Sequence, residues 1–179
     1  SGSEAASQVA QLVLMDSDFS KMPAVVAEGR RVVNNIERTA SLFLVKNIFS
    51  MLLSVFSVCM VLEYPLEPAQ ISLISMFTIG IPGFIMSLEP NKERIQGRFM
   101  SKVIRKALPA GLTDFLVVSA MVIFCQEFAV NAEDVSTACT IIVAIVGFMI
   151  LYRIASPMNR LHWIMLIGVI AGWLLCVME

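Results

Sequence analysis

A lysine and an asparagine lie together inside an apolar stretch that otherwise suits a lipid bilayer. Within residues 42–56, Lys46 and Asn47 are adjacent, and Ser50 follows one helical turn later. A charged side chain in the middle of a membrane span costs about 2.5–3.5 kcal/mol or more, so it usually faces a bundle interior or a water-filled cavity. One interpretation is that Lys46 extends to the aqueous interface. The other, which two further serines at helical spacing favour, is that this helix faces a polar transport pathway.

A second apolar stretch contains a proline in its middle. Residues 74–88 include Gly80 and Pro82, preceded by Ser75 and Thr78. Proline lacks a backbone N–H and crowds the carbonyl four residues earlier, so we expect the helix to break or unwind near Gly80–Pro82. Irregular backbone at membrane depth is tolerated where it lines a cavity, and broken helices form ion sites in transporters. The alternative is a kink that serves only packing.

Few other polar residues in the apolar stretches could do chemistry. Asp114 lies early in a later apolar segment, where it either reaches the interface or pairs with Lys46 across the bundle. The four cysteines include no C-x-x-C pair, so we interpret them as buried apolar residues rather than metal ligands. His162, the only histidine, stands at the edge of an apolar segment and suits an interfacial side chain.

The composition predicts a membrane protein. Of 179 residues 58% are hydrophobic and 15% charged, whereas soluble domains contain about 25% charged residues. The net charge of -1 gives no support for a nucleic-acid partner. A spanning helix needs about 20 apolar residues. Five segments qualify, which predicts an all-α membrane protein with a bundle of about five transmembrane helices: 39–62, 69–88, 108–128, 135–153 and 161–178.

The remaining segments predict the orientation of the chain. Residues 12–15 form a short apolar run that suits a buried strand, and residues 21–38 predict a helix that continues into the first span as a stalk. Residues 89–107 carry six Lys or Arg against two acids. The positive-inside rule places this basic loop and the N-terminal segment in the cytoplasm. Its apolar residues share one side, which suits an interfacial helix.

Residues 2–38 resemble the end of the phosphorylation domain of P-type ATPases, where it leads into the fifth transmembrane helix. In the second span, TIGIP at 78–82 is similar to the T-D-G-L-P motif of the sixth helix in calcium pumps, and Asn47 matches an asparagine ion ligand of the fifth. The resemblance implies that residues 1–20 are an α/β remnant of that cytoplasmic domain and that the five spans are the fifth to ninth helices. The matching residues of the first segment are Gly2, Ala5, Ala10, Val13, Leu14, Asp16, Phe19, Glu28, Gly29, Arg30, Asn35 and Ile36.

The resemblance implies a parent protein that uses ATP and Mg²⁺ to drive cation transport through a bacterial plasma membrane. The phosphorylated D-K-T-G-T motif is absent from this sequence. We therefore expect a multi-pass C-terminal fragment with a cytoplasmic N-terminus, without catalytic or cofactor-binding residues and inactive alone. Its expected partners are the lipid bilayer, the transported cation and the rest of the polypeptide: the actuator, nucleotide-binding and phosphorylation domains and the first four helices.

Departures from the family pattern affect the expected ion site. Ile79 stands where calcium pumps carry the aspartate of T-D-G-L-P, while Ser50 and Ser75 replace a glutamate and an asparagine ligand. A divalent metal such as calcium remains the expected cargo; a polyamine or other organic cation, or a non-enzymatic membrane scaffold, are the alternatives. We predict a cation pathway with Asn47 and Thr78 as metal ligands and Asp114 as the possible charge partner, its members being Lys46, Asn47, Ser50, Ser75, Thr78, Gly80 and Pro82.

Overall fold

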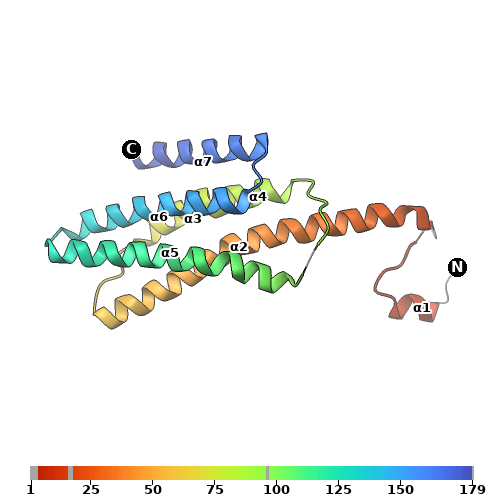
Figure 1. Cartoon of the computed structure of the whole chain (residues 1–179), viewed down its shortest axis with the longest axis horizontal. Coiled ribbons are helices and arrows are strands. Elements are labelled where there is room, and N and C mark those ends of the chain that lie inside the picture. The colour runs from red at the N-terminus through yellow and green to blue at the C-terminus, as the bar shows by residue number, and fades with distance from the viewer. Residues whose placement is uncertain (1–3, 16–17, 96, 179) are drawn as a thin grey trace.

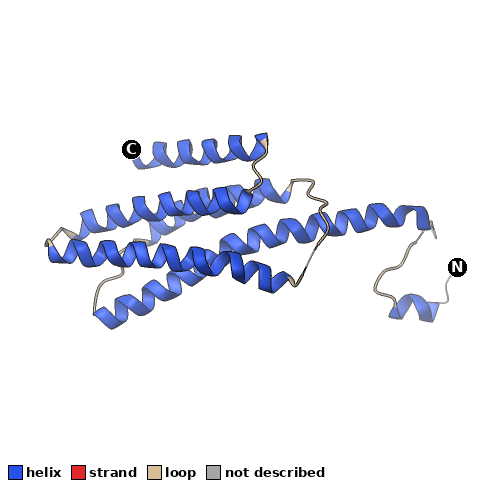
Figure 2. Cartoon of the chain, in the orientation of Figure 1, coloured by secondary structure: helices blue, strands red, loops and turns tan. Residues whose placement is uncertain are grey.

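The computed structural model describes residues 4–15, 18–95 and 97–178, which form an elongated bundle of helices (Figure 1). These residues contain helices and loops and no strand (Figure 2). The elements are α1 (Glu4–Val9), the 3₁₀ turn η1 (Phe19–Lys21), α2 (Met22–Met60), α3 (Pro68–Ser75), the π-helical turn η2 (Met76–Gly80), α4 (Ile81–Ser87), α5 (Phe99–Glu127), α6 (Ala132–Ala155) and α7 (Arg160–Met178).

Within residues 4–15, 18–95 and 97–178, five helical segments are long and apolar enough to cross a membrane, which confirms the predicted all-α membrane bundle. The expected strand at residues 12–15 is wrong. Leu12 and Met15 lie outside regular structure, 53% and 90% exposed. A strand needs a neighbouring strand to satisfy its backbone N–H and C=O groups, and the described part of the chain offers none. Among the described residues of the expected α/β remnant, the regular structure is the short helix α1 and the start of η1.

A single helix of 39 residues, α2, covers both the segment predicted as a stalk and most of the first predicted span. Pro23 lies in its first turn, where the missing N–H leaves no intrahelical bond unmade. At 1.5 Å per residue the helix is about 58 Å long, roughly twice the hydrocarbon thickness of a bilayer. It ends where Val61 adopts φ 55° and Leu62 donates its N–H to Ser57 O at 2.9 Å. This is the 6→1 bond of a Schellman motif.

The second span is not broken at Gly80–Pro82. It runs continuously from Pro68 to Ser87, and the distortion is the π-helical turn η2, in which Ile81 donates its N–H to Met76 O. Pro82 follows at the start of α4 and has no backbone N–H to donate. The helix continues past it because the preceding π-helical turn is wider than an α-helical turn.

Two glycines of neighbouring helices receive the side chains of η2. A Cβ added at Gly172 of α7 would lie 2.8 Å from Cε1 of Phe77, and one added at Gly147 of α6 would lie 2.9 Å from Cγ2 of Thr78. Real Cβ atoms essentially never approach that closely. The glycines therefore set how deeply the π-helical turn sits in the bundle.

The helix that contains the third predicted span begins before that span. Helix α5 starts at Phe99 rather than 108 and includes Pro109, so the second half of the expected 89–107 loop is helical. Its first turns are tied to α2, because Lys106 and Lys102 contact the buried carboxylate of Glu37 at 2.9 and 3.5 Å. These ion pairs hold the third span against the stalk.

Candidate cation site

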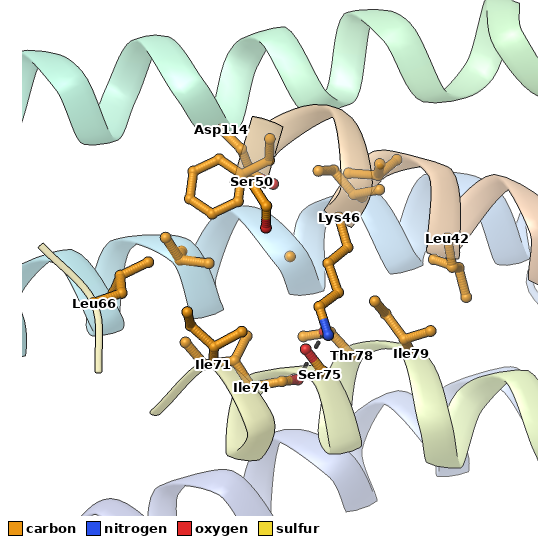
Figure 3. A pocket seen from close by; sticks show the side chains of 15 residues that line it. Leu42, Lys46, Ser50, Leu66, Ile71, Ile74, Ser75, Thr78, Ile79 and Asp114 are labelled. Atoms are coloured by element: carbon orange, nitrogen blue, oxygen red, sulfur yellow. Dashed lines mark hydrogen bonds between the residues drawn. The ribbon is translucent and has the colours of Figure 1, made fainter. Parts of the chain in front are cut away.

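A small cavity lies between α2, the α3–η2 segment, α5 and α6 (Figure 3). Its volume is about 50 Å³, whereas a single water needs about 10–15 Å³, so a few waters or one ion would fit. Most of its lining is apolar. The polar side chains in it are Lys46, Ser50, Ser75, Thr78 and Asp114.

Helix α2 supplies two polar members of the cavity from one face. Lys46 and Ser50 are four residues apart, so they project from the same side of the helix. Figure 3 shows the Lys46 side chain extending across the cavity toward Ser75 and Thr78. The ammonium is therefore directed into the bundle.

The π-helical turn supplies Thr78. This side chain is buried, and its hydroxyl donates to Ile74 O at 2.7 Å. Since the hydroxyl proton is used in this way, Thr78 can offer its oxygen lone pairs to a cation in the cavity. Ser75, which precedes the turn, lines the same cavity and is partly buried.

Three of the expected pathway residues lie elsewhere. Asn47 is exposed and does not line the cavity, because its side chain points about 100° away from that of Lys46 around the helix. Gly80 instead lines a larger groove of about 590 Å³ between α2 and α4. Pro82 is buried in α4 outside both spaces. The structure thus separates Asn47 from Thr78, the two expected metal ligands.

Asp114 is the acidic side chain of the cavity. It is 5% exposed, and its buried Oδ1 has no hydrogen-bond partner among the described residues. Within that part of the chain no ion pair joins it to Lys46, although both line the same space. Residues 4–15, 18–95 and 97–178 contain no cluster of three or more His, Cys, Asp or Glu that could hold a metal.

The chemistry of the donors is that of a weak cation site. One carboxylate and three hydroxyls surround the cavity, whereas Ca²⁺ takes 6–8 oxygen ligands, several of them carboxylates. The ammonium of Lys46 adds a positive charge to the same space. A divalent ion held here would need further acidic ligands.

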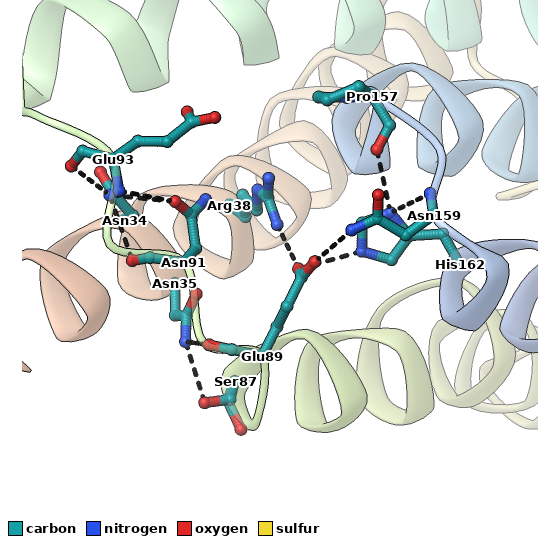
Figure 4. A network of polar contacts seen from close by, with 10 residues as sticks. All are labelled: Asn34, Asn35, Arg38, Ser87, Glu89, Asn91, Glu93, Pro157, Asn159 and His162. Atoms are coloured by element: carbon teal, nitrogen blue, oxygen red, sulfur yellow. Dashed lines mark hydrogen bonds and ion pairs between the residues drawn. The ribbon is translucent and has the colours of Figure 1, made fainter.

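A second polar cluster lies where the stalk meets the spans (Figure 4). The carboxylate of Glu89, just after α4, contacts the guanidinium of Arg38, and it accepts hydrogen bonds at 3.0 Å from Asn159 Nδ2 and His162 Nε2. Burial alone would raise the pKa of Glu89, but the His162 hydrogen bond and the Arg38 charge outweigh it and hold the pKa below its ordinary value.

The sequence did not indicate this cluster. His162 is fully buried, contrary to the interfacial position that its place beside Trp163 suggested. Its carboxylate partner lies 73 residues away in the chain, so no local pattern could reveal the contact. The charged residues Arg38 and Glu89 at the ends of two predicted spans were the available signal.

The same loop is fastened to α2 by two asparagines. Asn35 donates to the carbonyls of Ser87 and Glu89 at 3.0 and 2.9 Å, and Asn34 donates to that of Glu93 at 2.9 Å. Asn35 is buried. These hydrogen bonds attach α2 to the end of the second span.

Comparison with known proteins found similar sequences but no similar solved structure. The chain is 39% identical to "Calcium-transporting ATPase CtpE" of Mycolicibacterium smegmatis, over 88% of this chain and 22% of that protein. It is 32% identical to "Probable cation-transporting ATPase exp7" of Streptococcus pneumoniae, over 97% and 23%. It is 28% identical to a "Calcium-transporting ATPase" of Bacillus subtilis, over 78% and 16%. No family model and no solved structure matches.

The chain spans less than a quarter of the length of each of these relatives, while they match most of the chain. The similarity therefore concerns one segment of a longer kind of protein. The chain is homologous to a segment of bacterial calcium- and cation-transporting ATPases, and the predicted relationship to the P-type pumps of the calcium-pump-like branch is confirmed.

Proposed function

We propose that this chain is the membrane part of an ATP-driven cation pump and carries part of its ion pathway. The observation that supports this most directly is the cavity with Lys46 inside a bundle of membrane-spanning helices. Polar side chains in a span mark ion pathways, because lipid does not compensate their desolvation. Two polar residues of the cavity, Lys46 and Ser50, come from α2, the helix that would also form the stalk.

The pump would reside in a bacterial plasma membrane with its stalk in the cytoplasm. The parent would bind ATP and Mg²⁺ through segments outside this chain, which itself contains no D-K-T-G-T motif. The pathway would include Lys46, Ser50, Ser75 and Thr78, with the exposed Asn47 and Gly80 facing helices that the rest of the polypeptide supplies. Pro82 would contribute only through its position after the π-helical turn, because it is buried in α4. In such a parent, the exposed Asn47 would meet one of the first four helices.

Lys46 would act as a built-in counter-charge. A tethered ammonium can occupy the cavity after the transported cation has left, which limits its return. The test is Lys46→Ala in the full-length pump, with Lys46→Arg as the variant that keeps the charge. We expect Lys46→Ala to change the cation concentration for half-maximal stimulation, whereas unchanged transport and unchanged apparent affinity would contradict this role.

The cargo is a divalent metal such as calcium in the leading proposal, since two of these three relatives are named calcium-transporting. A polyamine or other organic cation is the second candidate, because a cavity with one carboxylate and three hydroxyls suits an ammonium group as well as a metal. A scaffold without ATPase activity is the third.

One measurement separates the three proposals. The vanadate-sensitive ATPase rate of the purified, reconstituted parent would be compared with calcium, manganese, magnesium, zinc, potassium and spermidine. Stimulation by one metal would support a metal pump and identify its cargo. Stimulation by spermidine alone would identify an organic cation, not a metal, as the cargo. A parent without ATPase activity would support the scaffold proposal.

A further inference from the structure

We infer that Asp114 on α5 supplies the negative charge of the cation pathway and binds the transported cation from the side of the cavity opposite Thr78. This inference rests on the proposed pump function. It places the acidic ligand on the third span of this chain, whereas the expected metal ligands, Asn47 and Thr78, lie on the first two.

The burial of the Asp114 carboxyl and its unpaired oxygen favour a role in cation binding. The side chain is 5% exposed, and Oδ1 has no partner among the residues that the structure describes. An isolated carboxylate in an apolar environment is very costly. Its charge must therefore be compensated, by a proton or by a cation in the adjoining space. Because Asp114 lines the cavity, that space is directly accessible to it.

The position of Asp114 is fixed by a close helix contact one turn earlier. At Gly111 a Cβ would lie 2.8 Å from Cγ2 of Ile48 and 3.1 Å from the Val45 carbonyl. Residues three apart on a helix share a face, so this contact directs Asp114 toward α2. Figure 3 shows it on the same side of the cavity as Ser50. A cation there would have a carboxylate and a hydroxyl from two different helices.

Lys46 lies in the same cavity and would compete for this carboxylate. Its ammonium extends toward Ser75 and Thr78, away from Asp114 (Figure 3). One carboxylate cannot balance two cations in a low-dielectric space. The transported cation and the ammonium would therefore compensate Asp114 in alternation. It follows that removing Asp114 weakens cation binding, whereas removing Lys46 strengthens it.

The first test compares variants of the full-length pump in proteoliposomes. Each cation chloride of the stimulation assay is titrated, and the half-maximal concentration and the maximal ATPase rate are measured separately. We expect Asp114→Asn to raise the half-maximal concentration at least 10-fold with a smaller change in maximal rate, and Asp114→Glu to recover part of the loss. Ser119→Ala is the matched control: Ser119 is a buried polar residue of the same helix that does not line the cavity.

The second test needs no variant. Dicyclohexylcarbodiimide modifies protonated carboxyl groups in apolar surroundings, and peptide mapping of the wild-type pump would locate the modified residue. We expect modification of Asp114 to slow when the stimulating cation is present at saturating concentration. Modification that is equally fast with and without this cation would overturn the inference even if Asp114→Asn failed to fold.

The outcomes separate the inference from the function on which it rests. A wild-type pump that no cation stimulates would overturn both. A stimulated wild-type pump with a folded Asp114→Asn variant of unchanged half-maximal concentration would overturn only the assignment of Asp114. Opposite shifts in Asp114→Asn and Lys46→Ala would support the competition between ammonium and cation.

Discussion

The contact of Gly111 with α2 permits a quantitative prediction for Gly111→Ala. An added methyl would lie 2.8 and 2.9 Å from two carbon atoms of Ile48 and 3.1 Å from the Val45 carbonyl. Ordinary contacts start near 3.4 Å, so α2 and α5 must separate by several tenths of an ångström. The Val45 carbonyl belongs to a helix backbone and cannot rotate away. Overpacking of this kind costs about 1–3 kcal/mol.

The change from glycine to alanine also has a favourable part that a control must remove. Alanine in a helix is about 1 kcal/mol better than glycine, which partly offsets the overpacking at Gly111. Gly168 of α7 is the matched control, because a Cβ there meets no atom within 4 Å. We expect Gly168→Ala to be neutral or stabilising. The difference between the two variants then isolates the overpacking.

The assay is thermal unfolding of the purified full-length pump in detergent, with the cation titration as a second measurement. Gly111→Ala should be less stable than Gly168→Ala by about 1–3 kcal/mol. It should also need a higher cation concentration for half-maximal stimulation, because the displaced α5 carries Asp114. If the two variants unfolded at the same temperature, the close packing of α2 and α5 at this point would be refuted.

Three other predictions concern the cluster around Glu89 and the π-helical turn. Glu89→Gln should destabilise the bundle by about 1–3 kcal/mol, since it leaves Arg38 and His162 without their carboxylate; thermal unfolding measures this, and equal stability would contradict it. Because the pKa of Glu89 is lowered in the fold, its stabilisation should be complete above the ordinary glutamate pKa of about 4.3 and should be lost as the pH falls through the lower folded value; unfolding temperatures from neutral to acidic pH should show this loss in wild type and not in Glu89→Gln. Gly147→Ala should displace Thr78, whose Cγ2 would lie 2.9 Å from the new Cβ. It should therefore weaken cation stimulation several-fold relative to Gly168→Ala. An unchanged cation titration would contradict the assignment of Thr78 to the site.

The helices of the bundle could be predicted from the sequence because their signals are local. Each span is a predominantly apolar run of sufficient length, and the turn at 61–67 separates the first two. The amphipathic pattern within 89–107 indicated a helix, but its junction with the third span as one helix from Phe99 was missed, because these first turns are basic. The carboxylate of Glu37 compensates that charge through Lys102 and Lys106, 65 and 69 residues away, and no local pattern contains this pairing.

The candidate site could be predicted only in part, for the same reason. Lys46, Ser50, Ser75 and Thr78 were recognisable as polar residues in apolar runs, and they do line one cavity. The outward position of Asn47 and the π-helical turn in place of a break depend on how the helices pack. The glycines that contact Phe77 and Thr78 are Gly172 of α7 and Gly147 of α6, which lie far along the chain. The position of Asp114 in the cavity likewise depends on packing, because it is set by the contact of Gly111 with α2.

The ion pairs along α2 connect its N-terminal half to two other elements of the bundle. Glu37 and Arg38 are consecutive, yet Glu37 binds α5 and Arg38 binds the loop after α4. A rotation of α2 at this level therefore strains two contacts on different sides at once. Lys46 follows Glu37 by nine residues, about 13.5 Å along the helix. Because a helix transmits rotation along its axis, a rotation of α2 would swing the ammonium across the cavity while α5 and the loop after α4 are pulled at their contacts with Glu37 and Arg38. The ion pairs of Glu37 and Arg38 would resist this rotation.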